Sequence, residues 1–173
     1  MPYTESPGPS GPKIAPPRFA ADVMLGKTAK WLRILGFDTF YDNHADDPFL
    51  RDLCRREGRV LLTRDTRLQL SMPAGHGYLV RQNYPRLQLA EINRVFGLAG
   101  FSLPSRCSVC NGELLPVEKN GVRKKVPPYV WSSQSDFSNC RQCRRIYWPG
   151  THLDRIKLFI ENIGKPDGGI PPD

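Results

Sequence analysis

The chain has 173 residues and a formal net charge of +8, with 39% apolar and 24% charged residues. This composition is typical of a soluble globular protein, and no apolar run approaches the ~20 residues that a membrane helix needs. The charge favours a polyanionic partner, either nucleic acid or an anionic membrane surface, although many small proteins are basic without a specific partner.

Residues 1–17 are rich in proline and hold no apolar core segment. They predict a disordered leader in place of a signal peptide, and the absence of an export signal predicts a cytoplasmic protein. Thiols stay reduced in that compartment, so clustered cysteines there favour metal binding over disulfides.

From residue 18 onward, short apolar runs alternate with amphipathic segments. The first predicted helix has apolar residues at helical spacing and stops at Gly36, and the second starts at Asp46-Asp47-Pro48 and stops at Gly58. The predicted strands are residues 18–23, 37–41, 60–63 and 77–80, and the predicted helices are residues 26–35, 46–58 and 87–96. This alternation predicts an α/β domain over residues 18–104, with a parallel sheet flanked by helices.

The character of the sequence changes near residue 105, where turn-forming residues, cysteines and basic residues begin to dominate. Two C-x-x-C pairs, Cys107 with Cys110 and Cys140 with Cys143, have the spacing of a tetrahedral zinc site. An iron–sulfur cluster or a redox dithiol are the alternatives, but two symmetric pairs favour structural zinc. Strand-like runs at 113–117 and 126–131 predict a zinc ribbon over residues 105–150, followed by a short helix at 151–163 within a loose segment, 151–173.

The predicted ribbon carries most of the surplus charge, because residues 105–150 hold eight basic and three acidic side chains. We expect the basic run Arg123, Lys124 and Lys125 to contact RNA phosphates. Four aromatic residues are interleaved with these charges and are candidates for base stacking: Tyr129, Trp131, Tyr147 and Trp148. For Trp131 and Tyr147 a place in the small ribbon core is the favoured alternative. Cys54, on the apolar face of a predicted helix, is interpreted as a buried, inert thiol.

Carboxylates recur where predicted strands end and helices begin. Asp22 lies at the end of the first strand, Asp65 follows the strand 60–63, and Asp47 opens a helix beside Asp46. The carboxyl ends of parallel strands share one edge of a sheet, and clustered carboxylates there can share Mg²⁺ or Mn²⁺. The alternative is that each aspartate merely caps a turn or helix.

Several motifs, in this order, resemble a PIN-like ribonuclease family named for the C-terminal domain of the Mut-seven exonuclease. They are residues 22–39 (DVMLGKTAKWLRILGFDT), 45–50 (ADDPFL), 62–65 (LTRD), 107–114 (CSVCNGEL), 126–128 (VPP), 140–143 (CRQC) and 147–152 (YWPGTH). The resemblance spans about residues 18–156. It implies a PIN-type fold with a zinc ribbon and a divalent-metal RNA phosphodiesterase.

By position, the resemblance implies that Asp22, Asp47 and Asp65 hold magnesium or manganese, with Asp46 a poorer candidate. It places Lys27 and Arg64 near the same edge, where they contact phosphate or remain solvated surface charges. PIN nucleases usually have a fourth acid after the next strand, but residues 80–83 read VRQN, so Asn83 offers only an amide oxygen. The favoured function is a metal-dependent ribonuclease whose ribbon aids RNA binding, and the main alternative is a non-catalytic RNA- or ribosome-binding adaptor with a degenerate PIN fold. A weaker third alternative is a protein-interaction module whose basic surface is incidental.

Overall fold

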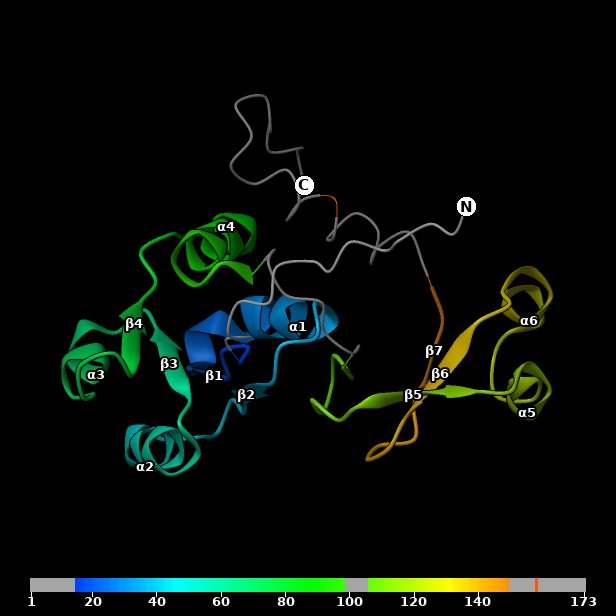
Figure 1. The fold of residues 1–173 in the computed structure, drawn as a ribbon, viewed down its shortest axis with the longest axis horizontal. Helices are drawn as coiled ribbons and strands as arrows, with labels where there is room; N and C mark the ends of the chain where they lie inside the picture. The colour runs from blue at the N-terminus through cyan, green and yellow to red at the C-terminus, as the bar shows by residue number, and fades with distance from the viewer. Residues whose placement is uncertain (1–14, 99–105, 150–157, 159–173) are drawn as a thin grey trace, which may run out of the picture.

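The computed structural model describes residues 15–98, 106–149 and 158. Two lobes lie side by side in Figure 1, and we name them the sheet lobe (residues 15–98) and the ribbon lobe (residues 106–149). Among the described helices, none is both long and apolar enough to cross a membrane. Most of the predicted leader, and the predicted helix at 151–163 apart from Leu158, lie outside the described residues.

The sheet lobe contains four parallel strands in the order β2-β1-β3-β4. The strands are β1 (Phe19–Ala21), β2 (Thr39–Tyr41), β3 (Val60–Thr63) and β4 (Gly77–Leu79). The helices are the 3₁₀ helix η1 (Val23–Leu25), α1 (Gly26–Ile34), α2 (Asp47–Glu57), α3 (Thr66–Leu70) and α4 (Pro85–Phe96). The parallel sheet flanked by helices is as predicted. Helix α3 was not predicted, because five residues with one buried side chain, Leu68, give no helical period.

Alternating side chains of the central strands build two apolar layers. Phe19 and Ala21 pack with α1 and α4, whereas Ala20 packs with α2 and α3 on the other face. Figure 1 shows the two pairs of helices on opposite sides of the sheet. Cys54 belongs to the second layer and is fully buried, as predicted, and burial raises the pKa of its thiol to about 11.

The start of α2 follows from helix-capping chemistry, because Asp46 accepts a hydrogen bond from the Phe49 amide at 2.9 Å and Pro48 lies in the first turn. Gly58 ends the helix in the left-handed conformation, at φ 63°. The capping carboxylate is therefore Asp46, and Asp47 is an exposed residue of the first turn.

The ribbon lobe is a three-stranded antiparallel sheet with strand order β5-β6-β7 and two short helices. Its elements are β5 (Leu114–Val117), α5 (Lys119–Val122), α6 (Pro128–Ser133), β6 (Phe137–Cys140) and β7 (Ile146–Tyr147). The prediction of a strand at 126–131 was wrong. Pro128 fixes a helical φ at the first position of α6, and Val126 and Val130, four residues apart, pack into the lobe's small core.

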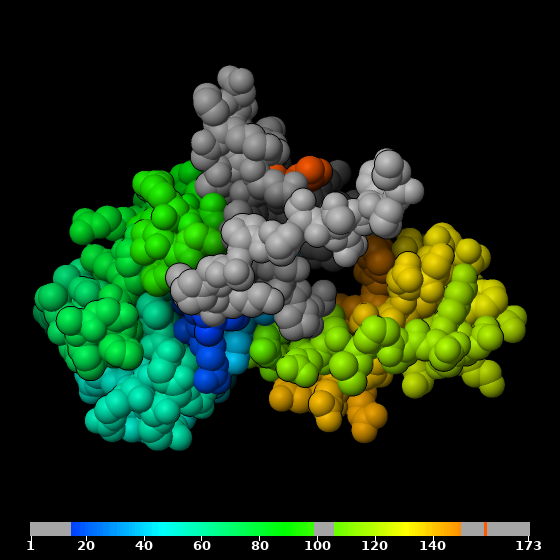
Figure 2. Space-filling view, viewed as in Figure 1, coloured from blue at the N-terminus to red at the C-terminus, as the bar shows by residue number. Residues whose placement is uncertain are grey.

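The first cysteine turn of the ribbon lobe covers the exposed edge of β2. The Asn111 side chain accepts a hydrogen bond from the Thr39 amide at 3.0 Å and donates one to Asp38 at 2.8 Å. The buried guanidinium of Arg33 bridges the same junction, donating to the carbonyls of Thr39 and Val109 at 2.8 Å each. Edge strands need such protection from unwanted pairing, so the ribbon lobe completes the sheet lobe. Figure 2 shows the two lobes next to each other in space-filling form.

Candidate functional site

The four predicted cysteine ligands meet at one point. Their sulfur atoms all lie within 4.8 Å of one another, with Cys107 and Cys143 3.6 Å apart and Cys110 and Cys140 3.4 Å apart. Tetrahedral thiolates around zinc stand about 3.8 Å apart, given a zinc–sulfur bond of about 2.3 Å. The four cysteines are therefore positioned to bind one metal ion, and they fit a structural zinc.

The two C-x-x-C turns are built alike. The Asn111 amide donates to the Cys107 carbonyl at 2.9 Å, and the Arg144 amide donates to the Cys140 carbonyl at 3.1 Å. Each turn ends in a left-handed residue directly after its second cysteine, Asn111 at φ 66° and Arg144 at φ 63°. This turn directs both sulfurs of a pair to the same side, so the short-range sequence determines half of the site.

Neighbouring polar groups contact the Cys107 sulfur. The Tyr147 hydroxyl lies 2.9 Å from the Cys107 sulfur. Burial alone would raise the pKa of Cys107, but hydrogen bonds from Tyr147 and from the Cys110 amide lower it to about 6. A thiolate ligand must be deprotonated, so this environment prepares Cys107 for a metal. For Tyr147 we predicted a place in the small ribbon core, but its hydroxyl instead contacts a cysteine of the metal centre.

A second group of interest lies at the carboxyl ends of β1 and β3. The Thr63 hydroxyl donates a short hydrogen bond to Asp22, and the Asp65 amide donates to the same hydroxyl at 2.9 Å. Asp22 also accepts from the Met24 amide at 2.7 Å, and its side chain is almost completely buried. The fold therefore brings Asp22 and Asp65 to one place from positions 43 residues apart in the sequence.

The Asp65 carboxylate is only partly engaged. Its Oδ1 atom caps α3 by accepting from the Arg67 and Leu68 amides at 2.6 and 3.1 Å. Its Oδ2 atom has no hydrogen-bond partner among the described residues, and the residue is exposed. An exposed carboxylate oxygen at this edge is suited to a hard cation.

Asp47 lies at the start of α2, on the same edge of the sheet, because it follows the carboxyl end of β2. Within the described ranges, three or more His, Cys, Asp or Glu ligand atoms come within 4.8 Å of one another only at the four cysteines. The three aspartates do not form such a compact set, and Asp22 and Asp65 are the pair linked through Thr63.

The remaining predicted residues at this edge have different surroundings. Lys27 is exposed in the first turn of α1. Arg64 donates a short hydrogen bond to the side-chain oxygen of Asn83, so the amide oxygen considered as a weak ligand is already engaged. Trp31, on the same helix as Lys27, packs partly buried against the first apolar layer.

Sequence reasoning missed one carboxylate near this edge. Glu91 of α4 is buried and accepts hydrogen bonds from the Tyr78 hydroxyl at 2.9 Å and from the Arg81 and Gln82 amides at 3.1 and 3.0 Å. Glu91 lies beside residues 80–83, the segment that lacks the fourth acid. The three donors occupy its carboxylate, and the hydrogen bonds hold this segment in place. Its position on the inner face of α4, between Leu89 and Ile92, was the available signal.

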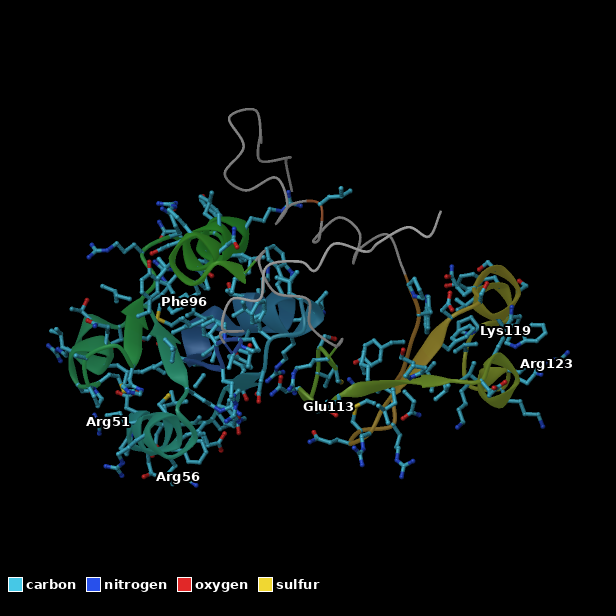
Figure 3. The ribbon with its side chains drawn as sticks, viewed as in Figure 1. Arg51, Arg56, Phe96, Glu113, Lys119 and Arg123 are labelled. Carbon is cyan, nitrogen blue, oxygen red and sulfur yellow. The ribbon has the colours of Figure 1, made fainter. Side chains whose placement is uncertain are left out.

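One of the predicted phosphate contacts of the ribbon lobe, Arg123, lies beside Lys119 at the end of this lobe that faces away from the sheet lobe (Figure 3). Both place their charges over the Trp131 ring, at 5.0 and 4.8 Å from its centre. Trp131 thus has the predicted core role with a cationic cover, whereas Lys124 and Lys125 are exposed.

The comparison with protein families gives one result that covers most of the chain. The model described as the Mut7-C RNAse domain matches residues 17–160, which includes both lobes. No curated protein and no solved structure matches the chain. With its parallel sheet, its four-cysteine centre and this match, the chain belongs to the Mut7-C RNase domain family.

Proposed function

We propose that this protein is a cytoplasmic, divalent-metal-dependent ribonuclease, with a nuclease domain over residues 18–104 and a zinc ribbon over residues 105–150 that aids RNA binding. Membership of the Mut7-C RNase domain family supports RNA as the substrate. The observation that carries the proposal is the linked pair Asp22 and Asp65 at the carboxyl ends of β1 and β3.

The position of this pair in the fold is the usual one for a ligand site. After β1 the chain crosses through α1 to β2 on one side, and after β3 it crosses through α3 to β4 on the other. Helices α1 and α3 lie on opposite faces of the sheet. The strand order therefore reverses between β1 and β3, and open α/β sheets bind ligands at that point.

The donor set at this point fits Mg²⁺ or Mn²⁺, which prefer carboxylate oxygens. Asp22 and Asp65 would hold the ion, and Asp47 would contribute from the start of α2. A bound divalent ion supplies charge for the phosphate oxygens and makes a water molecule more acidic. Thr63 orients the Asp22 carboxylate, while Lys27 and Arg64 attract and position the phosphodiester.

The test is Mn²⁺-dependent cleavage of a labelled RNA by the zinc-loaded chain. Asp22→Asn and Asp65→Asn should each lower the cleavage rate at least 100-fold, because the amide removes the negative charge while keeping the side-chain shape. Asp46→Asn is the matched control, since asparagine caps helices as well as aspartate does and Asp46 is not in the linked pair. Unchanged cleavage in both test variants would contradict the proposal.

The alternative function is a non-catalytic RNA- or ribosome-binding adaptor. It is favoured by the lack of a carboxylate in residues 80–83, where PIN nucleases usually have a fourth acid. The amide oxygen of Asn83 does not replace that acid, because it already accepts a hydrogen bond from Arg64. The adaptor predicts salt-sensitive RNA binding without any Mn²⁺-stimulated cleavage. The same cleavage assay separates the two functions.

A further inference from the structure

The ribbon lobe has a groove that the proposed catalytic site does not use. Its volume is about 610 Å³, and it runs between the two cysteine turns and the segment before α6. Its lining includes three basic residues, Lys125, Arg144 and Arg145, and two aromatic residues, Tyr147 and Trp148. We name it the ribbon groove.

The charge of the ribbon groove is uncompensated. Its lining contains no carboxylate, and within the described parts of the chain none of its three basic side chains forms an ion pair. By contrast, a cavity of about 420 Å³ at the lobe junction is lined by Arg59 and Arg106 together with Asp38. There, Arg59 pairs with Asp38 at 2.7 Å. The lining of the junction cavity thus contains carboxylates, Asp38 and Glu113, that compete with phosphates for its basic side chains, whereas the lining of the ribbon groove contains none.

Trp148 and Tyr147 give the ribbon groove an aromatic wall. The indole of Trp148 is 38% exposed, so its surface is accessible to a ligand. Tyr147 is fixed by the contact of its hydroxyl with the Cys107 sulfur at 2.9 Å. A rigid aromatic surface beside cations is the combination that stacks unpaired bases while their phosphates are neutralised.

The backbone of Arg144 provides independent support. Arg144 is left-handed at φ 63°, a conformation in which glycine or asparagine is strongly preferred. The equivalent position of the first cysteine turn is Asn111, whose side chain docks onto the sheet lobe. A role of the Arg144 side chain in the ribbon groove would explain why an arginine occupies this unfavourable conformation.

We propose that the ribbon groove binds single-stranded RNA, with phosphates on Lys125, Arg144 and Arg145 and a base stacked on Trp148. This inference rests on the proposed RNA substrate and specifies it further as unpaired RNA. Duplex RNA keeps its bases stacked inside the helix and cannot present one to Trp148. Because stacking accepts every base, the groove selects for strandedness and not for sequence.

The binding test uses the zinc-loaded full chain carrying Asp22→Asn, without added Mn²⁺, and fluorescence anisotropy with a labelled 12-nucleotide oligouridine. Trp148→Ala should weaken binding about tenfold, as expected for losing one stacked base. Arg144→Ala combined with Arg145→Ala should weaken it further and reduce the steepness of its salt dependence. Arg55→Ala with Arg56→Ala is the matched control, because it removes the same charge from exposed positions on α2 and should change binding less than twofold.

A second variant separates binding from folding. Arg144→Gly removes the unfavourable left-handed side chain, so zinc content and thermal midpoint should be retained or rise, while affinity for oligouridine falls. Wild-type affinity in Trp148→Ala and in the double arginine variant, or equal affinity for single-stranded and duplex RNA, would overturn the inference. Failure of Mn²⁺-dependent cleavage with normal groove binding would refute the catalytic proposal and leave this one standing.

Discussion

The two lobes achieve a defined structure by different means. The sheet lobe buries two apolar layers, one on each face of its parallel sheet. The ribbon lobe has four buried apolar residues outside its cysteines, which are Val122, Val126, Val130 and Phe137. So small a core rarely supports a fold alone, and the four cysteines are positioned to bind a metal ion that would supply the missing stability.

The same contrast holds for their candidate sites. The cysteine ligands come in two local pairs, each formed by one turn, and their sulfurs are gathered within 4.8 Å. The two aspartates follow separate strand ends and are linked through a single threonine, because the Thr63 hydroxyl donates to the Asp22 carboxylate and accepts from the Asp65 amide. A structural centre is thus assembled by local turns, whereas the proposed catalytic pair depends on the whole parallel sheet.

The largest expected effect follows from removing the metal ion. Cys110→Ser, or stripping zinc with a chelator, should unfold the ribbon lobe while the sheet lobe keeps its helices and strands. Structural zinc contributes about 10–16 kcal/mol to the folding of small domains. NMR amide spectra should then lose the dispersed signals of residues 106–149 and keep those of residues 15–98. A ribbon lobe that remains folded without metal contradicts the contrast drawn between the lobes.

The next effect concerns the junction of the lobes. Arg33→Ala removes a buried guanidinium that serves carbonyls of both lobes, so we expect a loss of about 3 kcal/mol in the free energy of unfolding. Lys30→Ala, on the exposed side of the same helix, is the control and should change stability by less than about 0.5 kcal/mol. Urea unfolding measures both. Equal midpoints for the two variants would show that the lobes are not coupled through Arg33.

A smaller effect depends on pH and on Asp38. Burial would raise the pKa of Asp38, but hydrogen bonds from Arg59 and Asn111 lower it to about 2. Because the folded-state pKa lies below the unfolded value, the stabilisation of about 2 kcal/mol is complete above pH ~4 and is lost as the pH falls toward 2. Asp38→Asn should reduce the slope of stability against pH in this window. An unchanged slope in urea unfolding at pH 2–5 would show that Asp38 is not responsible.

The smallest expected effect concerns the packing around the metal centre. A Cβ atom at Gly112 would stand 2.9 Å from the Cys140 sulfur, so Gly112→Ala should weaken zinc affinity about tenfold. Gly121→Ala is the matched control, because a Cβ atom there meets nothing within 4 Å. Competition with a chromogenic chelator measures both affinities. Equal zinc affinity in the two variants would mean that the backbone adjusts without disturbing the ligands.

The sequence predicted most of the sheet lobe and the cysteine centre because their signals are local. A capping aspartate followed by proline predicts α2, and two C-x-x-C pairs predict the metal site. The helix α6 was mistaken for a strand because its apolar residues are few and the proline pair resembles a turn. The roles of Thr63 and Arg33 were not predictable, because each depends on which strand ends and carbonyls become neighbours after folding. For Glu91 the helical pattern indicated burial, but its hydrogen-bond donors come from another segment that only the fold brings near.

We propose above that Asp22 and Asp65 together bind a divalent ion. Electron paramagnetic resonance of Mn²⁺ added to the zinc-loaded chain measures this directly, since bound Mn²⁺ loses the sharp signal of the free ion. We predict saturable binding that weakens at least tenfold in Asp22→Asn and in Asp65→Asn and is unchanged in Asp46→Asn. Mn²⁺ binding of equal strength in all four proteins, or no binding in any, would contradict the account.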